Sequence, residues 1–181
     1  FGAFLAKIVR NLALDASCSF TYSGTSADAR AAALVGVAYG DFTVENVSVG
    51  AAVNASEGVA AGLIAITVGN GAGTILHSTV SGAVTGKTAA AGAVADAQSG
   101  ALTLTDVLCL GNVTAKIKGA GIAVSTGATV TASACRMLAT VAANQPSAVL
   151  SGENITQDAA CRPEFAAVRK TDLEPYYGYG T

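Results

Sequence analysis

The sequence of 181 residues contains no tryptophan, one methionine and one histidine, and only 12% of its residues are charged. The single histidine, His77, excludes a His-rich metal site and any mechanism that needs a pair of histidines. Ten basic and twelve acidic residues give a formal net charge of −2, and they are spread along the chain. Proteins that bind the phosphate backbone usually carry a basic patch, so nucleic acid is not an expected partner.

Long apolar runs are also missing. The stretch from Val59 to Val68 spans ten residues and is interrupted by Gly62 and Thr67. A membrane-spanning helix needs roughly 20 apolar residues, so the sequence predicts no membrane span. The first fourteen residues only superficially resemble a signal peptide, because charged and polar residues interrupt them. We interpret the chain, which lacks an initial Met, as a processed or excised segment.

The sequence does contain a repeat, built from an Ala/Gly-plus-aliphatic block. The block recurs at spacings of 30, 28, 30, 29 and 28 residues, starting at Ala3, Ala33, Ala61, Ala91, Ala120 and Ala148. Small-residue turns and then alternating runs follow, such as FTVENVSV from Phe42 and LTLTDVLCL from Leu102. Alternation with many Val, Ile and Thr residues is typical of strands rather than helices.

Repeats of this kind predict an all-β fold, a right-handed parallel β-solenoid. We expect about six rungs of 28–30 residues with three short strands each, in which stacked rungs share one narrow core of small residues. A Gly/Ala-rich helical bundle is the alternative, since alanine is the best helix former. The 21 glycines and the turn signals every 8–12 residues favour the solenoid.

The repeat unit resembles the GLUG-type repeat, which is named for a Gly-Leu-aliphatic-Gly block. Here the corresponding blocks are Ala33–Gly36, Gly62–Ala65, Gly92–Ala95 and Gly121–Val124, and the stretch Cys109–Thr114 matches the Cys…Gly-Asn-Val-Thr continuation of that repeat. Only the first block retains the final glycine. The resemblance covers about residues 1–160 and implies a parallel β-helix of large cell-surface and secreted proteins of bacteria and protists. It implies no catalytic residues.

The end of the chain has a different composition. From Cys161 the charge density rises, and this stretch holds two of the three prolines and three of the five tyrosines. We therefore divide the chain into solenoid repeats over 1–160 and a cap or subunit-docking tail over 161–181. Aromatic residues near the two ends are candidate assembly residues, namely Phe1, Phe4, Phe165, Tyr176, Tyr177 and Tyr179.

Four N-glycosylation sequons occur among only seven asparagines. They begin at Asn46, Asn54, Asn112 and Asn154. Chance predicts about one sequon at this content of Ser and Thr, so the excess favours a secreted chain with glycans on at least one site. Strands rich in Ser and Thr also generate sequons without function, and bacteria do not use them.

The four cysteines form no CxxC pair, so the sequence supports neither a zinc site nor a redox motif. Cys109, Cys135 and Cys161 fall near one column of three successive rungs, where a disulfide between neighbouring rungs is geometrically feasible. Cys18 is left over. Buried free thiols are the alternative, because cysteine packs well in a narrow core.

The sequence offers little support for catalysis. Some β-helices are polysaccharide-acting enzymes that use paired carboxylates in a groove. Asp41, Glu45 and Asp96 share a face here only if turns of two rungs align, so we expect these acids to be solvated turn residues. No phosphate loop and no calcium-binding repeat is present, and we predict no enzyme activity, no metal and no cofactor.

Two functional classes remain. The first, which we favour, is a non-enzymatic extracellular structural protein, a subunit of a filament or surface appendage that assembles head-to-tail through its solenoid ends. The second is an adhesin module that binds glycans or other surface proteins. Adhesive faces usually expose aromatic residues along the shaft, whereas the aromatic residues here cluster at the ends.

Overall fold

Parallel strands in four sheets, joined by turns, build the described part of the chain, and no helix occurs in it. The computed structural model describes residues 3–4, 8–164 and 168–170. In each coil the chain passes through sheets B, C, D and A in turn, as in the succession β6, β7, β8 and β9. The predicted all-β parallel solenoid is thus confirmed.

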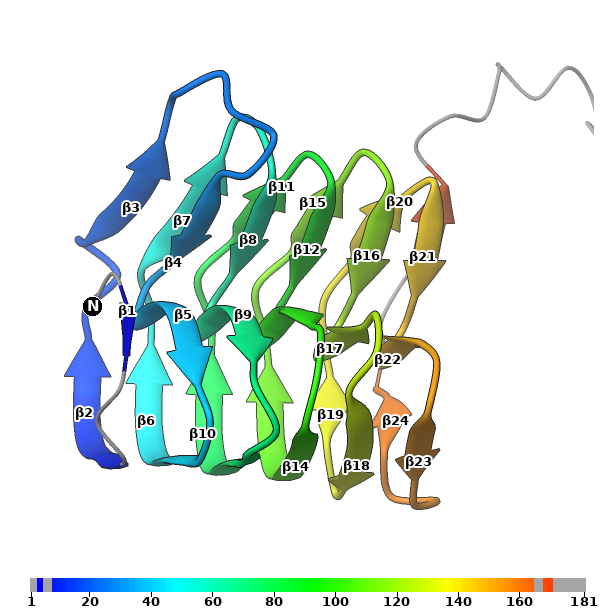
Figure 1. Cartoon of the computed structure of the whole chain (residues 1–181). Coiled ribbons are helices and arrows are strands. Elements are labelled where there is room, and N and C mark those ends of the chain that lie inside the picture. Colours follow the sequence, from blue (N-terminus) through cyan, green and yellow to red (C-terminus); the bar gives the residue numbers. More distant parts are fainter. Residues whose placement is uncertain (1–2, 5–7, 165–167, 171–181) are drawn as a thin grey trace, which may run out of the picture.

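Sheet B contains the longest strands and forms one wall of the solenoid (Figure 1). Its strands are β2 (Ile8–Leu14), β6 (Phe42–Val49), β10 (Ala72–Val80), β14 (Ala101–Cys109), β18 (Thr129–Ser133), β19 (Arg136–Met137), β23 (Ile155–Gln157) and β24 (Arg162–Pro163). Sheet C extends the same wall with β3 (Ser19–Tyr22), β7 (Ala52–Ala55), β11 (Val84–Gly86), β15 (Val113–Ala115), β20 (Val141–Ala143) and β25 (Val168–Lys170).

Sheets D and A form the opposite wall. Sheet D contains β4 (Arg30–Ala32), β8 (Val59–Ala61), β12 (Ala89–Ala91), β16 (Lys118–Ala120) and β21 (Gln145–Ser147). Sheet A contains β1 (Ala3–Phe4), β5 (Val35–Tyr39), β9 (Ile64–Val68), β13 (Val94–Ala97), β17 (Ala123–Ser125) and β22 (Leu150–Gly152).

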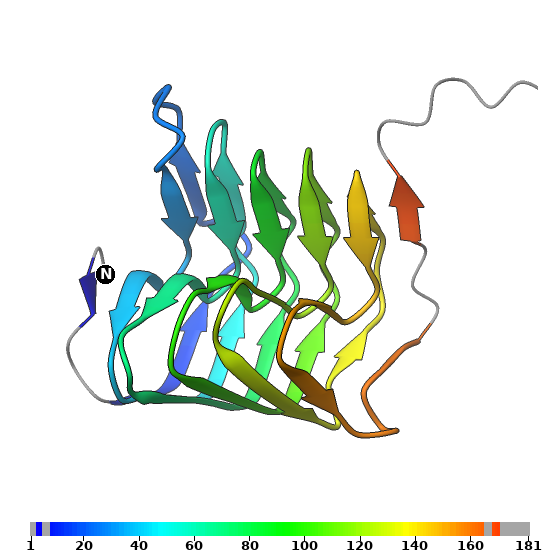
Figure 2. The ribbon, with the colours of Figure 1, turned by 45° about the vertical axis from the view of Figure 1, so that its right-hand side comes forward.

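The coil is right-handed. In Figures 1 and 2 the strands of sheet A run downward at the front, those of sheet B run upward behind them, and successive coils advance from left to right. This hand is the usual one for parallel strands joined by crossovers, and it agrees with the prediction.

The coils differ in detail from those expected. Five complete coils are present among the described residues, and each passes through four sheets rather than three, with the sheet B segment of the fifth coil divided into β18 and β19. The additional strand is in sheet D, where segments such as Ala89–Ala91 are buried on both faces and so show no alternation in the sequence. The coils also shorten along the chain. In sheet B, Ile8 and its register partner Thr43 on the next coil are 35 residues apart, whereas Thr131 and its partner Thr156 are 25 residues apart.

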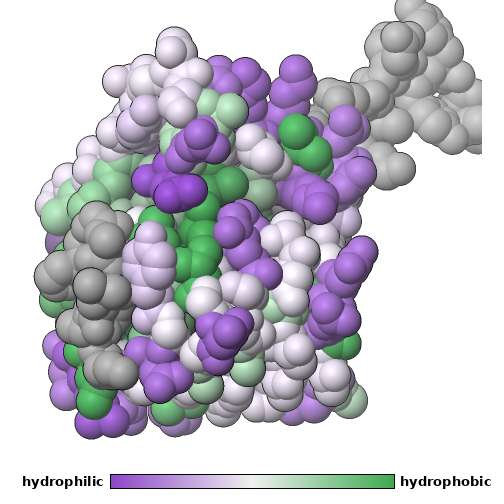
Figure 3. All heavy atoms as spheres, viewed as in Figure 1, coloured by the Kyte–Doolittle hydropathy of each residue, from purple (hydrophilic) through white to green (hydrophobic). Residues whose placement is uncertain are grey.

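Two apolar cores hold the coils together. The main core lies inside the solenoid and includes Val44, Ile75 and Leu104, which stack in register in sheet B. A second core lies outside, in the concave corner between sheets D and A, and consists mainly of small residues such as Ala61, Ala91 and Ala120. Figure 3 shows this corner as a hydrophobic strip in a hollow between hydrophilic side chains.

Glycines form the bend between sheets D and A. A Cβ on Gly92 would meet the Cys109 Sγ atom and the Gly121 carbonyl oxygen, and a Cβ on Gly121 would meet the Ala148 carbonyl. The bend therefore packs directly against the end of sheet B and against the bend of the next coil. These glycines are the first residues of the repeat blocks seen in the sequence, so close backbone approach explains that part of the repeat.

Candidate functional site

The first coil leaves core side chains half-exposed at the N-terminal end of the solenoid. Its inward-facing residues Val9, Leu12, Leu14 and Phe20 are only partly buried. Their partners in register on the second coil are almost completely buried, namely Val44, Val47, Val49 and Val53. An inner coil has a neighbouring coil on both sides, and the two neighbours cover its core residues. Among the described residues, strands β2, β3 and β4 of the first coil have a neighbour on one side only.

A hollow of about 370 Å³ opens at the same end. Phe20, Tyr22, Arg30 and Val37 are among the residues that line it. Tyr22 stands in register with the buried Ala55, yet 37% of its surface is exposed. Strands β2, β3 and β4 each pair on one side only. Unpaired strand edges beside an apolar core are a template for pairing with another chain.

The C-terminal end is built differently. Pro146 lies in β21, the last strand of sheet D, and Pro163 lies in β24, which together with β23 ends sheet B. Glu164 lies 2.9 Å from Arg162 and 3.8 Å from Arg136, so an ion-pair cluster also occupies this edge. Prolines and charges are the features by which natural proteins prevent pairing at an edge strand.

Asp158 organises the turn between β23 and β24. Its Oδ1 atom accepts hydrogen bonds from the backbone N–H groups of Ala134, Ala160 and Cys161, at 3.0–3.2 Å. Partial desolvation raises the pKa of this carboxyl, but the N–H donors, led by Ala134, outweigh it and the net pKa is lowered. The ionised Asp158 side chain therefore holds this turn against the preceding coil, to which Ala134 belongs.

A column of left-handed residues follows the outer face of sheet B. Asn11, Asn46, His77, Asp106 and Ala134 occupy equivalent positions on five coils, with φ between 46° and 54°. Left-handed backbone is costly for residues other than glycine, though asparagine and aspartate tolerate it better than most. Each of these residues shifts the inward–outward alternation by one position, as a β-bulge does.

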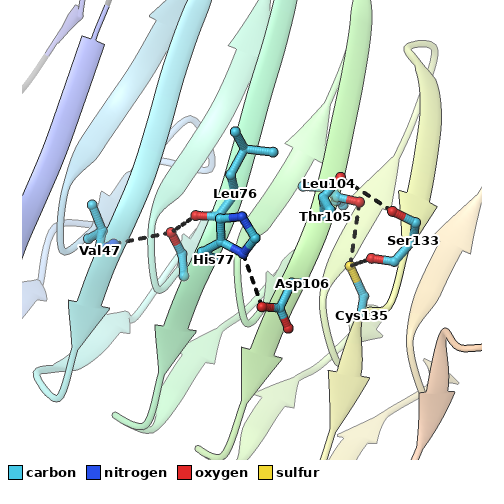
Figure 4. Close-up of polar contacts among 9 residues, drawn as sticks. Val47, Leu76, His77, Leu104, Thr105, Asp106, Ser133 and Cys135 are labelled. Atoms are coloured by element: carbon cyan, nitrogen blue, oxygen red, sulfur yellow. Dashed lines mark hydrogen bonds and ion pairs between the residues drawn. The ribbon is translucent and has the colours of Figure 1, made fainter.

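Hydrogen bonds join the column from coil to coil. His77 Nδ1 lies 3.1 Å from Asp106 Oδ2, and Figure 4 shows the ring directed toward that carboxylate. Beneath the bulge the buried Ser78 hydroxyl donates to the Leu76 carbonyl and accepts from the Val47 N–H. His77 is exposed on the outer face of β10, and the alternation in the sequence gave no sign of the bulge at its position.

The acids considered for catalysis make structural contacts. Glu45 forms a 2.6 Å ion pair with Arg10, and Asp41 accepts a hydrogen bond from the Ala72 N–H. Asp96 accepts from Thr126 and Gln98. Within the part of the chain that the structure describes, no group of three or more His, Cys, Asp or Glu residues is placed to hold a metal ion.

Two of the three cysteines proposed for one column are in register. Arg136 pairs in register with Arg162, so the residues just before them, Cys135 and Cys161, stack on each other. The Cys135 N–H donates to the Cys161 Sγ atom at 3.3 Å. Cys109 stacks instead on Met137. All four cysteines are free in the structure, and Cys18 is exposed. A disulfide between Cys135 and Cys161 stays a prediction, whereas the register does not favour one between Cys109 and Cys135.

The four sequon asparagines are all exposed. Asn54 lies on the outer face of β7 in sheet C, and Asn112 lies in the turn before β15 of the same sheet. Asn46 donates its side-chain amide to Asn11, and Asn154 has left-handed backbone. Accessibility is compatible with glycosylation at each of them, which stays a prediction.

Of the six aromatic assembly candidates, Phe4 lies in β1, and Phe1, Phe165, Tyr176, Tyr177 and Tyr179 lie outside the described residues. The boundary predicted at residue 160 falls inside the sheets, because β24 and β25 continue the pairing of sheets B and C.

No known protein family, no curated protein and no solved structure matches the chain. No helix that is long and apolar enough to cross a membrane occurs among the residues described.

Proposed function

We propose that the chain is a non-enzymatic structural module of the cell exterior, of the GLUG-repeat type, that works by end-on association of its solenoid. One observation carries the proposal: the inward-facing residues of the first coil are half-exposed, although their partners in the next coil are buried. Full burial of a Val, Leu or Phe side chain contributes about 1.5–3 kcal/mol relative to exposure. Covering this end with another coil is therefore favourable.

The lateral surface supports the same interpretation. Its outer residues in sheet B are mostly small and polar, such as the column Thr43, Thr74, Thr103, Thr131 and Thr156. Its acids are engaged in hydrogen bonds and ion pairs that join coils. Such a shaft suits a rigid spacer, and the hollow with exposed apolar side chains lies at the end.

The experiment is sedimentation velocity of the full chain over a concentration series in reducing buffer. We expect association that strengthens with concentration. Tyr22 and Ile117 are both exposed large apolar side chains, the first in the hollow at the N-terminal end and the second on the turn between β15 and β16. Tyr22→Lys should weaken association, and the matched Ile117→Lys should not. A chain that is monomeric at all concentrations would overturn the proposal and favour the adhesin alternative.

The exterior location has its own test. We expect at least one of the four sequons to carry a glycan when the chain is expressed in a eukaryotic secretory pathway. Intact mass spectrometry before and after enzymatic deglycosylation measures this directly. The bare peptide mass before treatment would count against the exterior location while leaving end-on association open.

A further inference from the structure

Cys135 and Cys161 lie side by side in the main core, on two successive coils. Residues in register on adjacent strands have Cα atoms about 4.8 Å apart, inside the range of roughly 4.4–6.8 Å over which disulfides form. The Cys161 Sγ atom accepts the Cys135 N–H at 3.3 Å, so the Cys161 side chain is directed toward Cys135. Both partners are therefore placed for a bond between the two coils.

The carboxylate of Asp158 fixes the backbone on both sides of this pair. Its Oδ1 atom accepts from the N–H of Cys161 at 3.0 Å, and from the N–H of Ala134, the residue before Cys135, at 3.2 Å. One side chain thus holds the two cysteine-bearing segments together before any covalent bond is formed.

Little is lost when the Cys135 thiol gives up its hydrogen. Its sulfur lies 3.4 Å from the Ser133 carbonyl oxygen and 3.7 Å from that of Leu104 (Figure 4). A thiol is a weak donor. Oxidation therefore removes only weak hydrogen bonds.

The other two cysteines have no such partner. Cys109 stacks on Val80 in one direction and on Met137 in the other. Cys18 is exposed in the turn before β3, and the next coil contains no cysteine. Among the four cysteines, the register therefore brings one pair together.

From this geometry we infer that Cys135 and Cys161 form a disulfide in an oxidising compartment, and that this bond cross-links the coil of β23 and β24 to the coil before it. The oxidant is a small disulfide such as oxidised glutathione. The Cys161 thiolate attacks one of its sulfurs, forms a mixed disulfide and releases one glutathione thiolate. The Cys135 thiolate then attacks the Cys161 sulfur and releases the second. The two protons from the protein thiols pass to the two glutathione thiolates, so glutathione disulfide is reduced as the protein is oxidised.

The cross-link lies where pairing in sheet B is short. β24 pairs only with β19, at two register positions, and β23 pairs with β18 at three. In the middle of the same sheet, β10 and β14 pair at eight positions. The two cysteines are 26 positions apart, and closing a loop of that length stabilises a fold mainly by restricting the unfolded chain. The inference is independent of end-on association.

The first test is disulfide mapping of the full chain, refolded from urea in a mixture of reduced and oxidised glutathione. After free thiols are alkylated under denaturing conditions, trypsin cleaves after Arg136 and separates the two cysteines into peptides 119–136 and 137–169. We expect these two peptides to be joined, with Cys109 alkylated. Cys109→Ala is the matched control and should keep the link, whereas Cys161→Ala should lose it. A link from Cys135 or Cys161 to any other cysteine, or two alkylated thiols at these positions, would overturn the inference.

The second test is thermal unfolding of the oxidised and the reduced chain. We expect the midpoint of the oxidised wild type to be higher by about 5–10 °C, and a phosphine reductant to reverse the shift. Cys161→Ala should show no difference between the two conditions. Equal midpoints in the wild type would show that the bond does not stabilise the coils, and would overturn that part of the inference.

Discussion

The side-chain amide of Asn46 donates a hydrogen bond of 2.7 Å to Asn11 Oδ1, and both residues have left-handed backbone. The pair begins a column that continues through His77 and Asp106 to Ala134, whose methyl side chain cannot form a hydrogen bond. The bulge is thus a property of the stacked coils, which impose the same backbone on each residue that occupies the position.

Among the residues of this column, the left-handed backbone is least favourable for Ala134, because alanine rarely adopts φ near 53°. We expect Ala134→Gly to stabilise the protein by about 0.5–1 kcal/mol, since glycine adopts this conformation without a steric penalty. Ala132→Gly, two residues earlier on the buried face, should destabilise it by about 1–2 kcal/mol through lost burial and added chain entropy. Urea denaturation of the two variants checks the prediction, and equal signs would contradict it.

Gly92 tests the tight bend between sheets D and A. A Cβ there would meet both the Cys109 Sγ atom and the carbonyl oxygen of Gly121, so Gly92→Ala should cost about 3 kcal/mol or prevent folding. Gly40 is the control, because it has φ of 67° and open space around it. Gly40→Ala should cost only the conformational term, about 1–2 kcal/mol. Thermal unfolding would disprove the steric explanation if the two variants lost equal stability.

Thr67 is the one residue of the described chain with a buried side-chain oxygen that lacks a hydrogen-bond partner. It stands in sheet A between Ala38 and Ala97, which face the main core. Thr67→Val keeps the shape and removes the unsatisfied hydroxyl, so we expect a gain of about 1 kcal/mol. Thr103→Val on the exposed face of sheet B should change stability by less than about 0.5 kcal/mol. A loss of stability in Thr67→Val, measured by chemical denaturation, would indicate a partner for the hydroxyl.

The buried thiols predict a loss of stability in alkali. Burial raises the pKa of Cys135 to about 12 and raises that of Cys109 further. In the unfolded chain a cysteine ionises near pH 8.5, so above that pH the unfolded state binds fewer protons than the folded state. Stability should therefore fall as pH rises from about 9 toward 12, by up to about 1.4 kcal/mol per pH unit for each thiol.

The double variant Cys109→Ala/Cys135→Ala provides the comparison for this prediction, because it removes the two thiols and leaves the rest of the sequence unchanged. The slope of unfolding free energy against pH between 9 and 11 should be shallower in the variant. Identical slopes would show that these thiols are not responsible.

The sequence determined the type of fold because its signal is local and repeated. The spacing of the small-residue blocks and the alternation of runs such as LTLTDVLCL predict stacked parallel coils, and these features are read without knowing any distant contact. Gly92 and Gly121, which start two of these blocks, were equally visible, although the reason for Gly92, contact with Cys109 and with the next bend, depends on the assembled coils.

Only the tertiary structure decided the number of strands per coil, the second core and the difference between the two ends. Ala89–Ala91 carries no alternation because both its faces are buried, so no sequence pattern distinguishes it from a turn. Pro146 and Pro163 are visible in the sequence, but the direction in which their nitrogens point follows from the strand each one pairs with. Likewise, Leu12 and Val47 are both inward-facing aliphatic residues in register. Their different burial arises because one coil has a neighbour on each side and the first has a neighbour on one side only.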